Sequence, residues 1–293
     1  MQIALHLGLH CTNADMLAKA LARNAPALRK SGTLVPPPAR YRPLLSDAVE
    51  RLGDATPAPD ARAVLLDAIL AEDQATAPRR LVLSHENLLA GPRGVFEYAR
   101  PYPRTEQRLR AVGGLLGPNV ALYFGLRNPA TFLPAMLARS GAPSLDALTG
   151  GMPPAELSWA PVIAAARAAV PDAPITVWCM EDTALIWGEV VRAVAGLPSG
   201  TKIAGAFDML ASVMAPEGMR RFRAYLAQNP TITEAQKRRV MTTFLDKYAD
   251  ESAMEQVLDL PGWTDETVAL LSDLYDADIE DIAQINGVTV LAP

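Results

Sequence analysis

Short, continuous runs of apolar residues alternate along this chain with longer segments of helical periodicity. Runs of this kind are typical of strands that are buried on both faces of a parallel sheet. Each is followed by a helical segment, which favours repeated strand–helix–strand units. The predicted strands are residues 2–9, 80–84, 119–126 and 175–180, with a short strand at 288–290.

The segments of helical periodicity predict helices that cover both faces of this sheet. Their apolar residues recur three or four positions apart and form one stripe on each helix. The triple proline at 36–38 is expected to be extended or turn-like. The predicted helices begin near Asp15 and continue with 43–52, 61–71, 105–116, 129–138, 157–170, 183–195, two within 215–248 that divide at Asn229-Pro230, and 265–285.

These elements predict an α/β fold of three layers, in which a mainly parallel central sheet is flanked by helices and the C-terminal half is helical. The chain has 293 residues, of which 50% are hydrophobic. A chain of this length and composition can bury a sizeable core. We expect one domain over residues 1–293, with a mainly helical portion at 200–285 packed on it.

Charge and cysteine content exclude several classes of function. The formal net charge of −5 provides no field that would attract nucleic acid. The two cysteines, Cys11 and Cys179, are too few for a disulfide framework. No stretch approaches about 18 apolar residues and no basic leader precedes an apolar one, so we expect a cytoplasmic protein without a transmembrane segment. The oligomeric state is not predicted.

The turn after the first predicted strand has the position of a phosphate-binding loop but not its composition. Such a loop uses backbone N–H groups, often freed by glycines, together with a helix N-terminus and a lysine. Here the turn is HCTNA, residues 10–14, and neither lysine nor glycine lies between Leu9 and Leu17. Asp15 adds a negative charge. Residues 12–15 also fit a capping box, in which Thr12 and Asp15 satisfy the first N–H groups of the helix. The turn is therefore either a capped structural turn or an anion site.

Polar residues follow two further predicted strands at the same edge of the sheet. His85 and Glu86 come after the strand at 80–84, and Arg127 comes after the strand at 119–126. A histidine or a glutamate in this position could take a proton from a hydroxyl group. Alternatively, the two are ordinary strand-end residues, with Glu86 capping residues 87–89. Arg127 could bind an anion or form an ion pair with Glu181 or Asp182.

A metal site is an alternative interpretation of this edge. His10, Cys11, His85 and Glu86 carry groups that bind zinc and other transition metals. Their positions in the chain do not follow the spacing of a known ligand motif, so no metal is predicted. His6, within the first strand, is expected to be a hydrogen-bonded core residue.

Four short segments resemble the sulfotransferases that use 3′-phosphoadenosine 5′-phosphosulfate, especially the bacterial members. They are HLGLHCTNADML at 6–17, LSHE at 83–86, LRNP at 126–129 and VWCMED at 177–182. Their order and spacing span most of the chain. The resemblance implies a P-loop-like fold and sulfuryl transfer from that nucleotide to a hydroxyl or amine of a small molecule or saccharide.

The resemblance also assigns roles to individual residues. In the 5′-phosphosulfate loop, Cys11 stands where the family has lysine, Asn13 where it has glycine, and Ala14 and Asp15 where it has hydroxyl residues. Thr12 is retained, and His10 precedes the loop. Arg127 matches the arginine that holds the 3′-phosphate, whereas the companion serine is replaced by Ala135. His85 or Glu86 corresponds to the catalytic base.

Sulfuryl transfer depends on the groups that have changed. The leaving phosphate gains negative charge in the transition state, and one preorganised donor commonly contributes roughly 3–4 kcal/mol there. The replacements predict an impaired donor loop. The sequence leaves two classes open: a transferase with an unusual donor requirement, and a noncatalytic relative whose fold serves binding or assembly.

Overall fold

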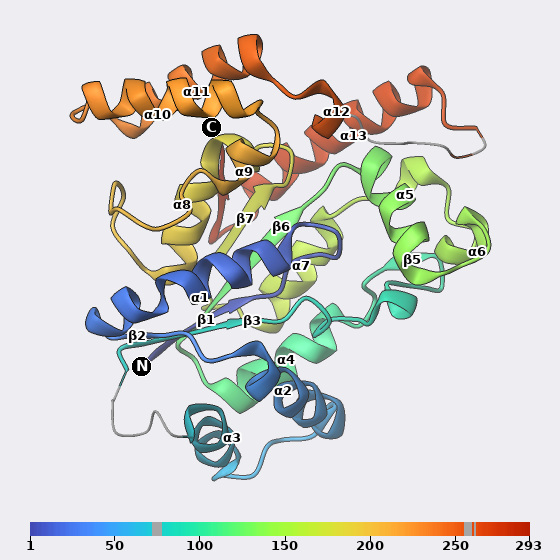
Figure 1. Cartoon of the computed structure of the whole chain (residues 1–293). Coiled ribbons are helices and arrows are strands. Elements are labelled where there is room, and N and C mark those ends of the chain that lie inside the picture. Colours follow the sequence, from blue (N-terminus) through green and yellow to red (C-terminus); the bar gives the residue numbers. More distant parts are fainter. Residues whose placement is uncertain (72–77, 255–259, 261) are drawn as a thin grey trace.

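The computed structural model describes residues 1–71, 78–254, 260 and 262–293. Its centre is a sheet of six strands in the order β2-β3-β1-β6-β7-β8, and all neighbouring strands are parallel (Figure 1). This arrangement confirms the predicted α/β class with a parallel central sheet flanked by helices. The strands are β1 (Gln2–His6), β2 (Thr33–Leu34), β3 (Arg80–Ser84), β6 (Val120–Leu126), β7 (Ile175–Cys179) and β8 (Val288–Leu291).

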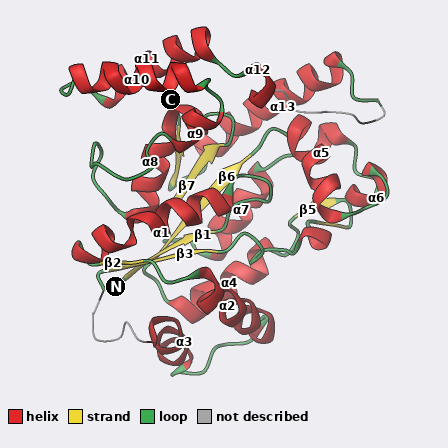
Figure 2. Cartoon of the chain, viewed as in Figure 1, coloured by secondary structure: helices red, strands yellow, loops and turns green. Residues whose placement is uncertain are grey.

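The helices lie between the strands in the chain and surround the sheet (Figure 2). Beyond residue 200 they occupy most of the described chain until β8, which agrees with the predicted helical C-terminal half. A small antiparallel pair, β4 (Phe96–Glu97) with β5 (Arg100–Pro101), was not predicted. The helices are α1 (Ala14–Lys30), α2 (Pro38–Leu52), α3 (Ala61–Leu70), α4 (Thr105–Leu116), α5 (Pro129–Ser140), α6 (Leu145–Thr149), α7 (Ala160–Ala169), α8 (Thr183–Ala195), α9 (Asp208–Ser212), α10 (Pro216–Gln228), α11 (Glu234–Tyr248), α12 (Glu251–Met254) and α13 (Asp265–Gln284), with 3-10 turns at Pro92–Gly94 and Pro154–Glu156.

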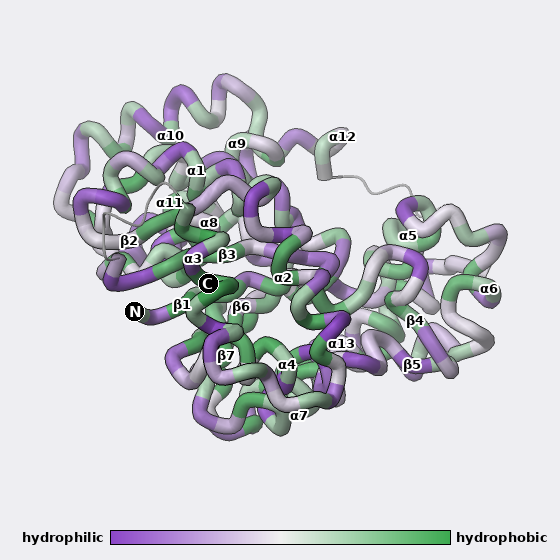
Figure 3. The backbone as a smooth tube through the Cα atoms, turned by 90° about the horizontal axis from the view of Figure 1, so that it is seen from below, coloured by the Kyte–Doolittle hydropathy of each residue, from purple (hydrophilic) through white to green (hydrophobic). Residues whose placement is uncertain are grey.

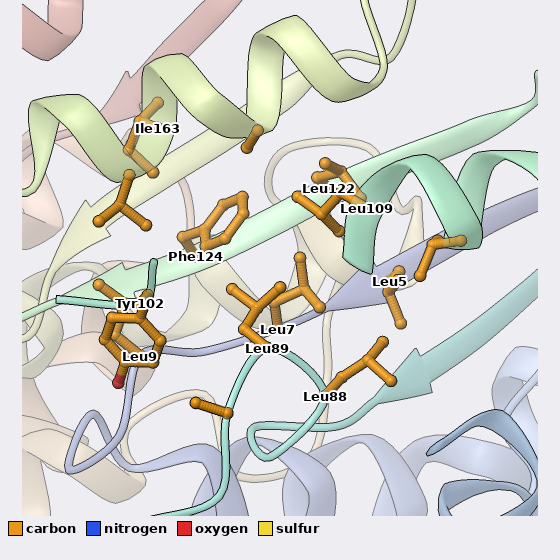
Figure 4. Close-up of a cluster of buried hydrophobic side chains, with 14 of the residues drawn as sticks. Leu5, Leu7, Leu9, Leu88, Leu89, Tyr102, Leu109, Leu122, Phe124 and Ile163 are labelled. Carbon is orange, nitrogen blue, oxygen red and sulfur yellow. The ribbon is translucent and has the colours of Figure 1, made fainter. Parts of the chain in front are cut away.

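Alternate residues of each strand contribute to different cores because successive side chains point to opposite faces of a sheet. On one face, Leu5 and Phe124 pack with side chains from α4 and α7 (Figure 4). On the other face, Ala4 and Tyr123 pack with residues of α1 and α8. The sheet is thus buried on both sides, which explains the continuous apolar runs in the sequence.

A third core joins the helices that follow α8. It contains Leu210, Met214, Met219, Phe222 and Met241 from the segment that includes α9, α10 and α11. Along α10 and α11 hydrophilic residues alternate with apolar ones (Figure 3). These helices therefore turn an apolar stripe toward their own core and toward α8. The described helices include none that is long and apolar enough to cross a membrane.

Two boundaries differ from the predictions at positions that matter for the site. Pro38 is not extended but begins α2, where a missing N–H costs no helical hydrogen bond. Strand β1 ends at His6 because Gly8 has a φ of +51°. The segment nevertheless stays beside β6, since the N–H groups of Leu7 and Leu9 bond to carbonyl oxygens of that strand.

Candidate functional site

The carboxyl ends of β3, β1 and β6 meet at one edge of the sheet. In the strand order of the sheet, β2 and β3 lie on one side of β1, and β6 lies on the other side. The chain therefore leaves β1 toward β2, and after β3 it passes β1 to reach β6. Ligands of parallel α/β folds bind at such a switch point. The predicted site residues of the first turn, of 85–86 and of 127 follow these three strands, so the topology brings their backbones together.

The N-terminus of α1, after the turn that follows β1, differs from the one that the sequence predicts. Asn13 is the N-cap of α1 and has the left-handed conformation, with φ 61° and ψ 28°. Its side chain makes no capping bond. The helix therefore starts at Ala14, which places Asp15 at the second helical position and leaves it exposed. A capping box needs an acid at the third position, so the predicted box is wrong.

Thr12 also differs from its predicted role as a cap. Its hydroxyl donates to the carbonyl oxygen of Leu9 at 2.5 Å, and the residue is buried. The side chain packs against Gly125 of β6, where even a Cβ atom would approach Thr12 to 3.0 Å. The one hydroxyl that matches the family pattern is thus directed back into the protein.

The backbone of the turn keeps features of an anion-binding loop. Cys11 and Asn13 both have positive φ, at 62° and 61°. Within the described residues, the N–H groups of Cys11, Asn13 and Ala14 have no hydrogen-bond acceptor, whereas residues 9–12 form a hydrogen-bonded turn. A backbone in which left-handed residues alternate with others directs its N–H groups toward one point, which is the geometry of an anion-binding nest.

Arg127 holds the same turn from β6. Its Nη1 donates to the carbonyl oxygen of Cys11 at 3.0 Å, and its Nε donates to Thr131 at 2.9 Å. Burial lowers the pKa of Arg127, and the negative charge of Glu181 partly opposes this effect. Glu181 itself accepts the N–H of Asn128 at 2.9 Å. Arg127 is therefore near the turn, as predicted, where it binds a carbonyl group of the protein.

His10 is buried on the inner side of the turn. The hydroxyl of Tyr102 accepts the backbone N–H of His10 at 2.9 Å and lies 2.8 Å from its Nδ1. The Nε2 atom lies 2.9 Å from Oδ1 of Asn87. This network assigns the proton to Nε2, because Tyr102 then donates to Nδ1. Burial lowers the pKa of His10, so the imidazole is neutral and both of its nitrogens are occupied.

His85 and Glu86 leave the sheet edge in different directions. The Nε2 of His85 lies 2.7 Å from the hydroxyl of Ser46 and 3.1 Å from the carbonyl oxygen of Arg42, both on α2. Burial and the charge of Arg42 lower the pKa of His85 to about 4. The carboxylate of Glu86 instead pairs with Arg139 of α5 at 2.5 Å, so the proposed cap on residues 87–89 is not formed.

Arg139 is the cation at this edge that sequence reasoning missed. It is in the last turn of α5, and both its charge and a hydrogen bond act on the thiol of Cys11. Burial nevertheless raises the pKa of Cys11 overall. The sequence around Arg139 does not predict this role, because its contact with Cys11 depends on the tertiary placement of α5.

Polar side chains also cluster at the end of β3, around Ser84. Of this cluster the sequence predicted only the role of His6. The Nδ1 of His6 lies 2.9 Å from the hydroxyl of Ser84, and the ring stacks on Trp178. The hydroxyl of Tyr41 donates to the carbonyl oxygen of Ser84 at 2.9 Å, and Arg42 donates to the same oxygen at 2.8 Å. His6 is thus a hydrogen-bonded core residue, as predicted. Burial lowers its pKa to about 3.

The structure directs the two candidate histidine ligands of a metal away from each other. His10 is directed toward Tyr102 and Asn87, while His85 is directed toward α2. Across the described residues, no three histidine, cysteine, aspartate or glutamate side chains are grouped so that they could hold a metal ion.

Comparisons with known proteins find a likeness in structure but not in sequence. No protein-family model matches the sequence, and no curated protein matches it significantly. The fold is similar to a sulfotransferase from Alicyclobacillus acidocaldarius, with a TM-score of 0.41 and 14% sequence identity. The alignment covers 81% of this chain and 96% of that one.

Proposed function

We propose that this chain is a noncatalytic relative of the sulfotransferases, whose fold serves binding or assembly. The proposal is supported by four sequence segments in the family's order, set on a parallel sheet whose strand ends meet at one edge. One observation carries the noncatalytic part: Thr12, His10, His85 and Glu86 each bond to another group of the protein, and of their polar side-chain atoms only Nδ1 of His85 is buried without a partner among the described residues. Thr12 binds Leu9, His10 binds Tyr102 and Asn87, His85 binds Ser46, and Glu86 binds Arg139.

These bonds oppose catalysis for a physical reason. A transferase stabilises the transition state with groups that are already aimed at the developing charge. Here Cys11 occupies the position of the family's lysine, and burial raises the pKa of its thiol. The hydroxyl of Thr12 faces away from the turn. A base must also be free to accept a proton. His85 is a weak base at a pKa of about 4, and Glu86 already neutralises Arg139.

A thermal-shift titration tests the proposal. A nucleotide at about 100 times its dissociation constant stabilises a protein by about 2.7 kcal/mol. We expect no change in melting temperature with millimolar adenosine 3′,5′-bisphosphate or with the phosphosulfate donor. The matched variant Cys11→Lys, Asn13→Gly, Asp15→Thr restores the family residues of the turn. Binding by this variant alone would show that the turn chemistry is the defect, whereas a shift in the natural chain would contradict the proposal.

A second candidate function is favoured by the backbone of the turn. The three N–H groups without an acceptor in the described chain, and the charge of Arg139 beside Cys11, fit a transferase in which arginine replaces the family's lysine. Arg127 would then hold an anionic part of the donor, and Glu86 would act as base after leaving Arg139. This candidate predicts a saturable thermal shift in the natural chain that Arg139→Ala abolishes. The noncatalytic proposal predicts no shift in either protein.

A further inference from the structure

A cavity of about 430 Å³ lies away from the sheet edge, between α8, the loop at 200–207, α10 and α11. In Figure 1, α10 and α11 lie on the outer side of α8, and residues of all three helices line the cavity. The volume is in the range of pockets that hold small organic ligands. The residues described above for the candidate site do not contribute to its lining.

Arg192 of α8 lines this cavity. Its side chain is only 8% exposed, although arginine is rarely buried. Nη2 donates to Glu234 at 3.0 Å, and Nη1 is 3.4 Å from the carbonyl oxygen of Thr201. The Nε atom is buried and has no partner among the described residues. A buried N–H donor without a partner costs free energy unless a ligand or a water molecule accepts a hydrogen bond from it.

The lining has more positive than negative charge. Glu234 pairs with both Arg192 and Lys237, the latter at 2.6 Å, so one carboxylate serves two cations. The other lining carboxylate, Glu189, is paired with Arg238. Lys202 is exposed at the cavity and forms no ion pair with any residue in the described chain. An anion that entered here would be attracted by Lys202 and Arg192 together.

The rest of the lining is largely apolar. A ligand body that replaced water on this surface would be stabilised by the burial of apolar area. A purely charged ligand such as inorganic phosphate would leave that surface wet. The apolar side chains that line the cavity are Leu185, Ile203, Phe207, Leu226 and Met241.

We propose that this cavity is a binding site for a small organic anion with an apolar body, such as an aryl- or alkyl-carboxylate. The carboxylate accepts hydrogen bonds from Arg192 and pairs with Lys202, and the hydrocarbon part contacts the apolar lining. The site is separate from the turn between β1 and α1 and does not depend on whether that turn binds a nucleotide.

Calorimetric titration with 4-phenylbutyrate and its neutral analogue 4-phenylbutanamide tests the site. We expect one carboxylate to bind per chain, at least about tenfold more tightly than the amide, which corresponds to about 1.4 kcal/mol. The absence of saturable binding of the carboxylate at concentrations up to about 10 mM would overturn the proposal. Equal affinity for the two compounds would also overturn it, because the charge would then contribute nothing.

Two variants locate the binding. Lys202→Glu reverses an exposed charge at the cavity and is expected to weaken carboxylate binding by about fivefold or more while changing amide binding little. Lys19→Glu, an exposed lysine on α1 outside the lining, is the matched control and should bind both compounds as the natural chain does. Leu226→Trp fills the cavity and should remove binding of both. Carboxylate binding that Lys202→Glu and Leu226→Trp leave unchanged would place the compound elsewhere and refute the site.

Discussion

Lowering the pH from 7 to 5 is expected to reduce the free energy of unfolding by roughly 4 kcal/mol. The cause is the burial of His6 and His85, which lowers their pKa to about 3 and about 4 in the folded protein. The unfolded chain takes up protons below its ordinary pKa of about 6.5, whereas the folded protein does not. This stability is therefore complete above about pH 6.5 and decreases as the pH falls toward the folded values. His10 acts in the same direction, since burial lowers its pKa too.

Urea unfolding at the two pH values measures this effect. The variant His6→Gln, His85→Gln is the control, because it removes both titrating groups and should lose most of the pH dependence. The comparison is needed because burial raises the pKa of Glu181 and Asp182, which stabilises the fold on acidification. Equal unfolding free energies of the natural chain at pH 7 and pH 5 would contradict the account of buried neutral histidines.

Asp278→Ala is expected to destabilise the fold by about 3 kcal/mol. The buried carboxylate of Asp278, on α13, accepts the backbone N–H groups of Trp159 and Ala160 at 2.6 and 3.1 Å. It also accepts the hydroxyl of Ser158 at 2.5 Å. It thereby caps α7 from another helix, and its loss leaves these donors without an acceptor. The indole of Trp159 in turn donates to the carbonyl oxygen of Arg127 at 2.9 Å, which links this cap to the candidate site.

Chemical denaturation of Asp278→Ala beside Asp281→Ala provides the measurement. Asp281 is an exposed acid on the same helix, so the pair separates the buried cap from a change in helix charge. The substitution at 281 should change the unfolding free energy by less than about 0.5 kcal/mol. Similar losses in both variants would show that the interhelical cap contributes little.

The sequence pattern was sufficient for the elements because the physical signal is local. The apolar run at 119–126 predicted β6 closely, and the Asn229-Pro230 break correctly divided α10 from α11. Pro38 was misplaced because proline is compatible with both an extended chain and the first turn of a helix. The two-residue strand β2 is too short to produce a periodic signal.

The site was less predictable because it depends on conformation and on distant contacts. The left-handed conformation of Asn13 makes this residue the N-cap of α1, so Asp15 is not at the position that a capping box requires. The sequence alone does not predict this conformation, because several residue types adopt it. Topology correctly placed His85 and Glu86 at the sheet edge. Their side-chain directions are set by Ser46 and Arg139, which are far away in the sequence.

At this edge Thr12, His10, His85 and Glu86 are each bonded within the protein, and we propose that the turn does not hold a nucleotide. The most direct test is a crystal structure grown with millimolar adenosine 3′,5′-bisphosphate. We expect no nucleotide at the β1–α1 turn, with the hydroxyl of Thr12 still donating to the carbonyl oxygen of Leu9. A phosphate group bound by the N–H groups of Thr12, Asn13 and Ala14, with Arg139 released from Glu86, would contradict it.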